Sequence, residues 1–309
     1  MYCGRPLMKR SCSQPCHGMQ TVSGVSVAPA NRWSNKKVLK ARVISALIMA
    51  PLVICGVLFL DNPVFSSILG AIALAGVWEW SHLIPLKTMT GRVIYTAAIA
   101  VLMWLLWLTG LELLIKPLLL VAFVWWLCAL LWLSRPELGA QASLLNSSLK
   151  MVAGVLVILP AWAALSTLHA HGERGPTLTL MLLMLVWLAD IGAYFAGRQW
   201  GKRKLAPAIS PGKTWEGVYG GLLASLLFAA IAGGLFSHSL RWTLAFMLIS
   251  LVAAMFSVAG DLLESLMKRQ SGIKDSGNII PGHGGIFDRI DSLVAAAPMF
   301  LIGYLWLAL

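Results

Sequence analysis

Residues 265–291, SLMKRQSGIKDSGNIIPGHGGIFDRID, concentrate the groups of this chain that could do chemistry. The run carries four basic side chains, three acidic side chains and a histidine, and it lies between two long apolar segments. Carboxylates are the ligands that hard divalent cations prefer, and basic side chains pair with phosphate oxygens. We therefore expect the chemical site of the protein to include this run.

The residues just before the run predict a metal site. On a helix, one stripe at spacing i, i+3, i+4 and i+7 would consist of Asp261, Glu264, Ser265 and Lys268. Two carboxylates from different segments, accompanied by basic residues, are the usual arrangement for Mg²⁺ that bridges phosphates. We predict Asp261 and Asp288 as that pair, holding Mg²⁺ alone or with a second cation. An amphipathic helix end with a Glu264–Lys268 ion pair explains the stripe equally well.

A glycine turn precedes the last apolar segment. Gly284 and Gly285 would let the backbone approach a ligand and expose N–H donors, and the helix start that follows favours anionic oxygen. We interpret His283 as a phosphate donor or loop anchor, because no second His or Cys accompanies it. Asp288 and Asp291 are spaced i, i+3 at the helix start, where capping alone would account for one of them.

Further polar residues are expected to bind phosphate. Basic groups predicted to neutralise phosphate in the run are Lys268, Arg269, Lys274 and Arg289. An earlier loop adds Lys202, Lys204, Ser210 and Lys213. Asp190 lies inside an apolar segment, which marks it as a functional candidate, with a role in helix packing as the alternative. Glu79, at the end of another apolar segment, fits either the site or a simple interface position.

Nine apolar segments must position these groups. They are near or above the roughly 18 residues that mark a spanning helix, and they lie at about 43–60, 64–80, 93–111, 117–133, 151–168, 177–197, 215–237, 241–260 and 292–309. The chain is 59% hydrophobic and 12% charged, and its mean hydropathy is +0.80. The sequence therefore predicts an all-α polytopic integral membrane protein with about nine transmembrane helices.

The basic residues predict the topology. With a cytoplasmic N-terminus, only Lys116, Arg174 and Arg241 of the 24 Lys and Arg residues fall in outside segments. The positive-inside rule then places the N-terminus in the cytoplasm and the C-terminus outside. This distribution accounts for the net charge of +12, so we expect no nucleic acid partner.

The signature residues resemble those of the phosphatidate cytidylyltransferase family, the CDP-diacylglycerol synthases. The resemblance rests on Ser265, Lys268, Arg269, Lys274, Asp275, Gly277, Pro281, His283, Gly284, Gly285, Asp288, Arg289, Ile290 and Asp291. The 202–217 loop and Gly260-Asp261-Leu262 are also similar. The resemblance runs from about residue 38 to the end of the chain.

The resemblance implies transfer of CMP from CTP to phosphatidate at a cytoplasmic site in a bacterial inner membrane. It implies metal ligation by Asp261 and Asp288, and the residues expected to carry catalysis are Asp261, Asp288, Lys274, Arg289 and His283. We expect a single helical membrane domain at 38–309, with the chemistry in 190–309. Residues 1–37 are expected to be a disordered extension, with translation starting near Val38. The sequence leaves a homodimer open.

Two other functions would also use some of these residues. A CTP-dependent polyprenol kinase would need similar nucleotide and metal groups but a different acceptor. A proton- or ion-coupled transporter would use intramembrane Asp190, but transporters usually place charges near the midplane of repeated halves. The charges here fall in cytoplasmic connections and no repeat is seen, so the enzyme is preferred.

Overall fold

The computed structural model describes residues 48–86, 88–141, 143–237, 239–273, 277 and 284–306. Eight helices within these ranges are long and apolar enough to cross a membrane. They are α2 (Asn62–Leu83), α3 (Met89–Thr109), α4 (Leu111–Leu133), α5 (Leu144–His169), α6 (Gly175–Trp200), α7 (Trp215–Ser237), α8 (Leu240–Ser271) and α9 (Phe287–Trp306). The prediction of a helical polytopic membrane protein is confirmed at this level.

The first predicted span is only partly visible. A shorter apolar helix covers Ile48–Phe59, and the rest of the 43–60 segment lies outside the described residues, as does the 1–37 extension. The predicted count of nine and the predicted sides of the two termini therefore stay predictions. Many large apolar side chains, including Leu113, Leu131 and Leu235, are exposed on the bundle surface, as expected for helices that face lipid.

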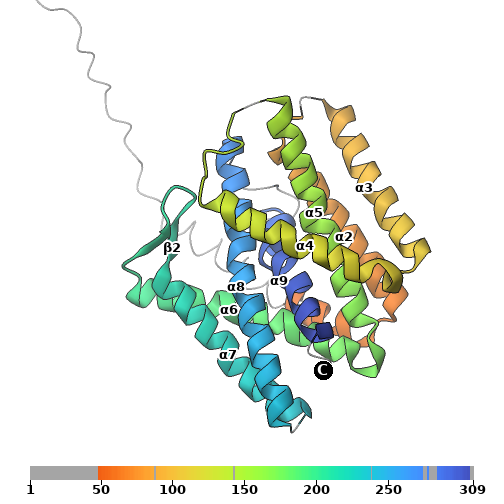
Figure 1. Cartoon of the computed structure of the whole chain (residues 1–309), viewed down its shortest axis with the longest axis vertical. Helices are drawn as coiled ribbons and strands as arrows, with labels where there is room; N and C mark the ends of the chain where they lie inside the picture. The colour runs from red at the N-terminus through yellow and green to blue at the C-terminus, as the bar shows by residue number, and fades with distance from the viewer. Residues whose placement is uncertain are drawn as a thin grey trace, which may run out of the picture.

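Helices α8 and α9 lie at the centre of the bundle. They pack on each other, and α8 also packs on α7 while α9 packs on α5. In Figure 1, α2–α5 lie to the right of α8, and α7 lies with the strands to its left. The C-terminal half therefore contributes both central helices, and the N-terminal half covers one side of them.

Helix α8 is longer than its apolar segment. It begins after Ser239, whose side chain accepts the N–H of Trp242, and it ends at Gly272, which has a φ of +69°. A left-handed residue at this position is a common helix terminator. The predicted polar stripe therefore does lie on a continuous helix, beyond the 241–260 span.

One small sheet was not predicted. Strands β1 (Lys204–Ala206) and β2 (Ser210–Thr214) pair antiparallel between α6 and α7. The carboxylate of Glu216 accepts the backbone N–H groups of Lys202 and Arg203, which fixes the start of this hairpin. The all-α prediction missed the hairpin because the loop has no apolar alternation to indicate strands.

Candidate active site

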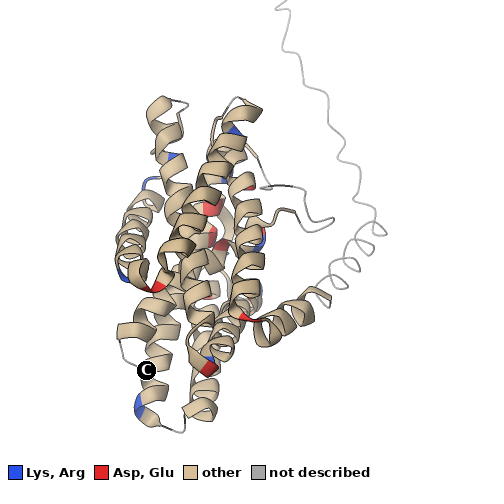
Figure 2. Ribbon diagram, turned by 90° about the vertical axis from the view of Figure 1, so that its right-hand side faces the viewer, with Lys and Arg blue, Asp and Glu red and all other residues tan. Residues whose placement is uncertain are grey.

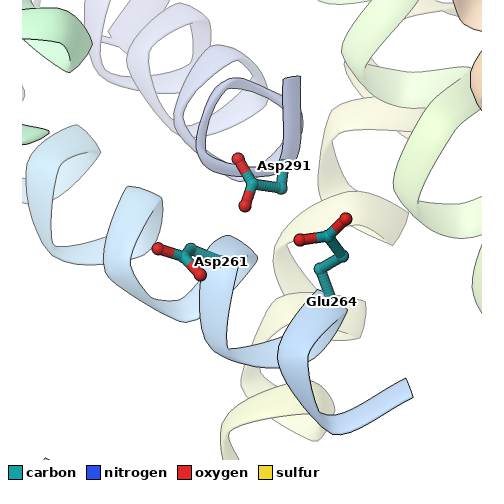
Figure 3. A group of neighbouring side chains, drawn as sticks. All are labelled: Asp261, Glu264 and Asp291. Atoms are coloured by element: carbon teal, nitrogen blue, oxygen red, sulfur yellow. The ribbon is translucent and has the colours of Figure 1, made fainter. Parts of the chain in front are cut away.

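Three carboxylates from α8 and α9 meet inside the bundle. One oxygen each of Asp261, Glu264 and Asp291 lie within 4.8 Å of one another. Figure 3 shows Asp261 and Glu264 on α8 on either side of Asp291 on α9. Figure 2 shows acidic segments grouped at mid-height of the ribbon, within the bundle. We call Asp261, Glu264 and Asp291 the acidic group.

The acidic group fits a hard divalent cation. Glu264 is 2% exposed, and its Oε1 atom is buried without a hydrogen-bond partner among the described residues. A buried carboxylate oxygen without a donor is costly, and three carboxylates this close repel one another. Mg²⁺ prefers oxygen ligands of this kind, so the donor set suits the metal that the sequence predicted.

Two lysines border the acidic group. The Nζ atom of Lys213, on β2, lies 2.5 Å from Oδ2 of Asp261. The Nζ atom of Lys268, on α8, lies 2.9 Å from Oε2 of Glu264 and 2.9 Å from Oδ1 of Asp288. These ammonium groups offset part of the carboxylate charge, and they could pair with phosphate oxygens of a ligand.

Asp288 lies next to the acidic group but does not belong to it. Its Oδ2 atom accepts the backbone N–H of Gly285 at 2.8 Å, so it holds the turn just before α9. Gly284 has a φ of +81°, and a Cβ there would lie 2.8 Å from the same oxygen. The structure thus brings Asp291, rather than Asp288, close to Asp261. The assignment of Asp288 as a metal ligand stays a prediction.

Glu79 joins the N-terminal half to this site. It is buried on α2, and its carboxylate accepts the N–H groups of Ile286 at 2.9 Å and Phe287 at 2.7 Å. These are the last residue before α9 and its first residue. Gly277 also lies against the carboxylate, because a Cβ on this glycine would clash with it. Glu79 therefore holds the start of the helix that carries Asp288 and Asp291.

The chain is similar to known proteins over most of its length. Residues 40–307 match the model of the cytidylyltransferase family. The chain belongs to this family. It is similar to the phosphatidate cytidylyltransferase of Pseudomonas aeruginosa, with 46% identity over 271 residues that cover 87% of this chain and 98% of that protein. It is also similar to the phosphatidate cytidylyltransferase of Haemophilus influenzae, with 41% identity over 285 residues, covering 86% of this chain and 98% of that protein.

The hairpin of this family member carries several predicted phosphate-binding residues. Lys202 and Lys204 are exposed and Ser210 is half-buried, and only Lys213 of the four is found bound to the acidic group. Arg269 is exposed at the end of α8, where its Nε donates to the carbonyl of Ile209 at 3.2 Å. Arg269 thus fastens the hairpin to α8 in this structure.

Some of the other predicted residues lie within the ranges that the structure describes, and others lie outside them. Asp190 is exposed on α6 and interacts electrostatically with Asp261 and Lys213. Arg289 is exposed next to Asp288, and Gly285 donates to that aspartate. Lys274 and His283, both predicted to act in catalysis, lie outside the described residues.

The sequence did not predict Glu264 and Asp291 as metal ligands. Glu264 was noted as a member of the polar stripe and Asp291 as a helix-start residue, but neither was assigned to metal. The i, i+3 spacing of Asp261 and Glu264 was the available signal. Their convergence with Asp291 depends on how α8 and α9 pack, which spacing within one segment does not show.

Proposed function

We propose that this cytidylyltransferase transfers CMP from CTP to phosphatidate, which forms CDP-diacylglycerol and releases pyrophosphate. The observation that supports it most is the acidic group with two bordering lysines, set in a chain that matches phosphatidate cytidylyltransferases over most of its length. The kinase and transporter alternatives gain no support from the comparisons.

The reaction asks little covalent chemistry of the side chains. A phosphate oxygen of phosphatidate attacks the α-phosphorus of CTP, the bond from that phosphorus to the bridging oxygen breaks, and pyrophosphate leaves. Positioning and neutralisation of charge dominate such phosphoryl-type transfers. Lys213 and Lys268 are suited to this task, because each places an ammonium group beside the acidic group.

We propose that Asp261, Glu264 and Asp291 hold a divalent cation, with Mg²⁺ as the preferred ion. A bound divalent cation supplies charge neutralisation and polarises phosphoryl oxygens. Asp288 is retained as a predicted further ligand, since Lys268 already links its carboxylate to Glu264. A second cation also stays a prediction.

The setting of the site is part of the proposal. We place it at the cytoplasmic side of a bacterial inner membrane, where lipid phosphate and cytosolic CTP can meet. The distribution of Lys and Arg supports this orientation. Blocking of single cysteines by a membrane-impermeant reagent, in intact cells and in inverted vesicles, would test it. The homodimer that the sequence left open is tested by the mass of the purified particle.

The function is tested with detergent-purified protein given CTP, phosphatidate and Mg²⁺. We expect a liponucleotide and pyrophosphate only when all three are present. ATP in place of CTP, and a polyprenol in place of phosphatidate, are the parallel controls. Phosphorylated polyprenol without liponucleotide would replace the proposal with the kinase function.

A further inference from the structure

A polar cavity lies away from the acidic group. It has a volume of about 200 Å³ and is lined by residues from α2, α5, the end of α8 and the 134–143 connection. Its polar lining includes His82, Gln141, Asn146, Lys150 and Gln270. His82 and Gln141 are exposed, whereas Lys150 is buried, so the lysine lies at the inner wall of the cavity and the other two lie toward solvent.

Lys150 is the notable residue of this cavity. The residue is 4% exposed, and its Nζ atom, which is not among the fully buried polar atoms, makes no hydrogen bond or ion pair within the described part of the chain. The cavity lining, as far as the structure describes it, contains no carboxylate. A buried ammonium without a counter-charge is strongly unfavourable. The cavity therefore has the charge and the space to take an anion.

The neighbouring polar groups narrow the class of anion. The amide Nε2 of Gln270 donates to Pro136 and Leu138 carbonyls, and Nδ2 of Asn146 donates to the carbonyl of Gln141. The NH2 groups of both amides are therefore already engaged, whereas Oε1 of Gln270 is buried without a hydrogen-bond partner among the described residues. Three N–H donors on one ammonium suit a compact anion with several oxygens better than a planar carboxylate. A phosphate group has that form.

The cavity is separate from the acidic group, and Trp80 connects its Lys150 to the start of α9. Gln270 follows Asp261 by nine residues on α8, which corresponds to about 13 Å along a helix. The backbone carbonyl of Lys150 accepts the indole N–H of Trp80 at 2.9 Å, and the Trp80 ring packs edge-on against Phe287. A ligand on Lys150 would therefore lie next to the part of α2 that positions the start of α9.

We propose that this cavity is a second phosphate site that takes a phosphate monoester or free phosphate on Lys150. It is distinct from the catalytic transfer and does not depend on it. Two sources share this chemistry, namely inorganic phosphate and the headgroup of phosphatidate. The cavity lies at helix ends beside the connection that carries Arg135, and this location suits either source.

Native mass spectrometry of the full chain in detergent counts bound ligands directly. One arm contains inorganic phosphate and the other contains short-chain phosphatidate, both with EDTA and without CTP. Wild type, Lys150→Gln and Arg135→Gln are compared, because Arg135 is an exposed basic residue of the neighbouring connection. We expect Lys150→Gln to bind at least one of the two ligands at least tenfold more weakly than wild type, and Arg135→Gln to bind like wild type.

The two arms identify the source. Loss of phosphate adducts alone indicates free phosphate, loss of lipid adducts alone indicates the headgroup, and loss of both indicates a site for the shared group. Equal binding by wild type and Lys150→Gln in both arms would overturn the proposal, as would equal losses in Arg135→Gln.

Lys150→Met is a second variant, used in case Lys150→Gln destabilises the protein. It removes the charge and keeps the apolar stem, so its melting temperature without ligand should equal or exceed that of wild type. A clearly lower value would mean that the ammonium has a partner inside the protein, which contradicts the proposal. Catalysis by the wild type is measured separately, so failure of the phosphate site leaves the transferase assignment intact.

Discussion

The carboxylate of Glu79 on α2 accepts the backbone N–H of Phe287, the first residue of α9, at 2.7 Å. The two residues are 208 positions apart in the chain. An N–H group at a helix start has no partner within the helix, and here the N-terminal half supplies one. The first half of the chain thus takes part in positioning Asp288 and Asp291.

Glu79→Gln should lower both stability and activity. The amide keeps the volume but has one acceptor oxygen for two N–H groups, and leaving a buried donor unpaired costs about 1–3 kcal/mol. We expect a lower melting temperature and roughly tenfold lower kcat, by analogy with loss of residues that orient metal ligands. The Mg²⁺ concentration for half-maximal activity should also rise, which a purely structural defect would not cause.

Glu112→Gln is the matched control for this change. Glu112 is exposed in the first turn of α4, so the same substitution removes a charge without removing a partner of α9. It should leave the melting temperature, kcat and Mg²⁺ requirement close to wild type. If Glu79→Gln behaved in the same way, the positioning role would be refuted.

Asp291→Asn tests the acidic group. This change replaces a charged carboxylate by a neutral amide of nearly the same volume. It should raise the Mg²⁺ concentration for half-maximal activity by roughly 10–100-fold, the range found when metal sites lose a supporting group. A titration of product formation against Mg²⁺ gives this value. An unchanged Mg²⁺ requirement would remove Asp291 from the ligand set.

Asp288→Asn should leave the protein inserted and folded but nearly inactive. The predicted cause is loss of a charge from the metal shell. The same change also removes the ion pair with Lys268 at 2.9 Å, so the Mg²⁺ titration is needed to tell the two effects apart. Normal activity in this variant would contradict the ligand assignment.

Gly284→Ala should impair catalysis through Asp288. Gly284 and Gly110 both have a φ of +81°, but a Cβ would meet Asp288 only at position 284, while Gly110 has no neighbour within 4 Å. Both alanine variants should lose about 1 kcal/mol of stability from the backbone conformation. Only Gly284→Ala should also lose activity, and equal activity of the two variants would show that the contact of this turn with Asp288 does not matter.

Removal of the metal should lower the melting temperature of the wild type more than it lowers that of the Asp261→Asn variant. A cation bound by the folded state raises its stability by mass action, and the close carboxylates repel each other without it. Thermal unfolding with EDTA and with Mg²⁺ measures this difference. Identical melting temperatures of wild type in the two conditions would argue against a metal in the acidic group.

The sequence predicted the helices well because each is a long apolar segment. It also predicted the polar stripe of Asp261, Glu264 and Lys268, since periodicity within one helix fixes which side chains share a face. The Glu264–Lys268 ion pair, noted as the alternative explanation, is present together with the acidic group.

Contacts between distant segments could not be predicted in the same way. Lys213 reaches Asp261 because a hairpin folds β2 back toward α8, and the loop sequence gives no strand alternation. Asp288 and Asp291 both lie in the first turns of α9, and the rotation of that helix decides which one faces Asp261. Glu79 was ambiguous because its partner is a backbone N–H, which leaves no residue pattern.

The fate of the phosphates of CTP tests the central claim most directly. Purified protein is given phosphatidate, Mg²⁺ and CTP that is radiolabelled at either the α- or the γ-phosphate. CMP transfer predicts that the α-label enters the lipid product and the γ-label leaves as pyrophosphate. Entry of the γ-label into lipid would contradict the account and show a kinase.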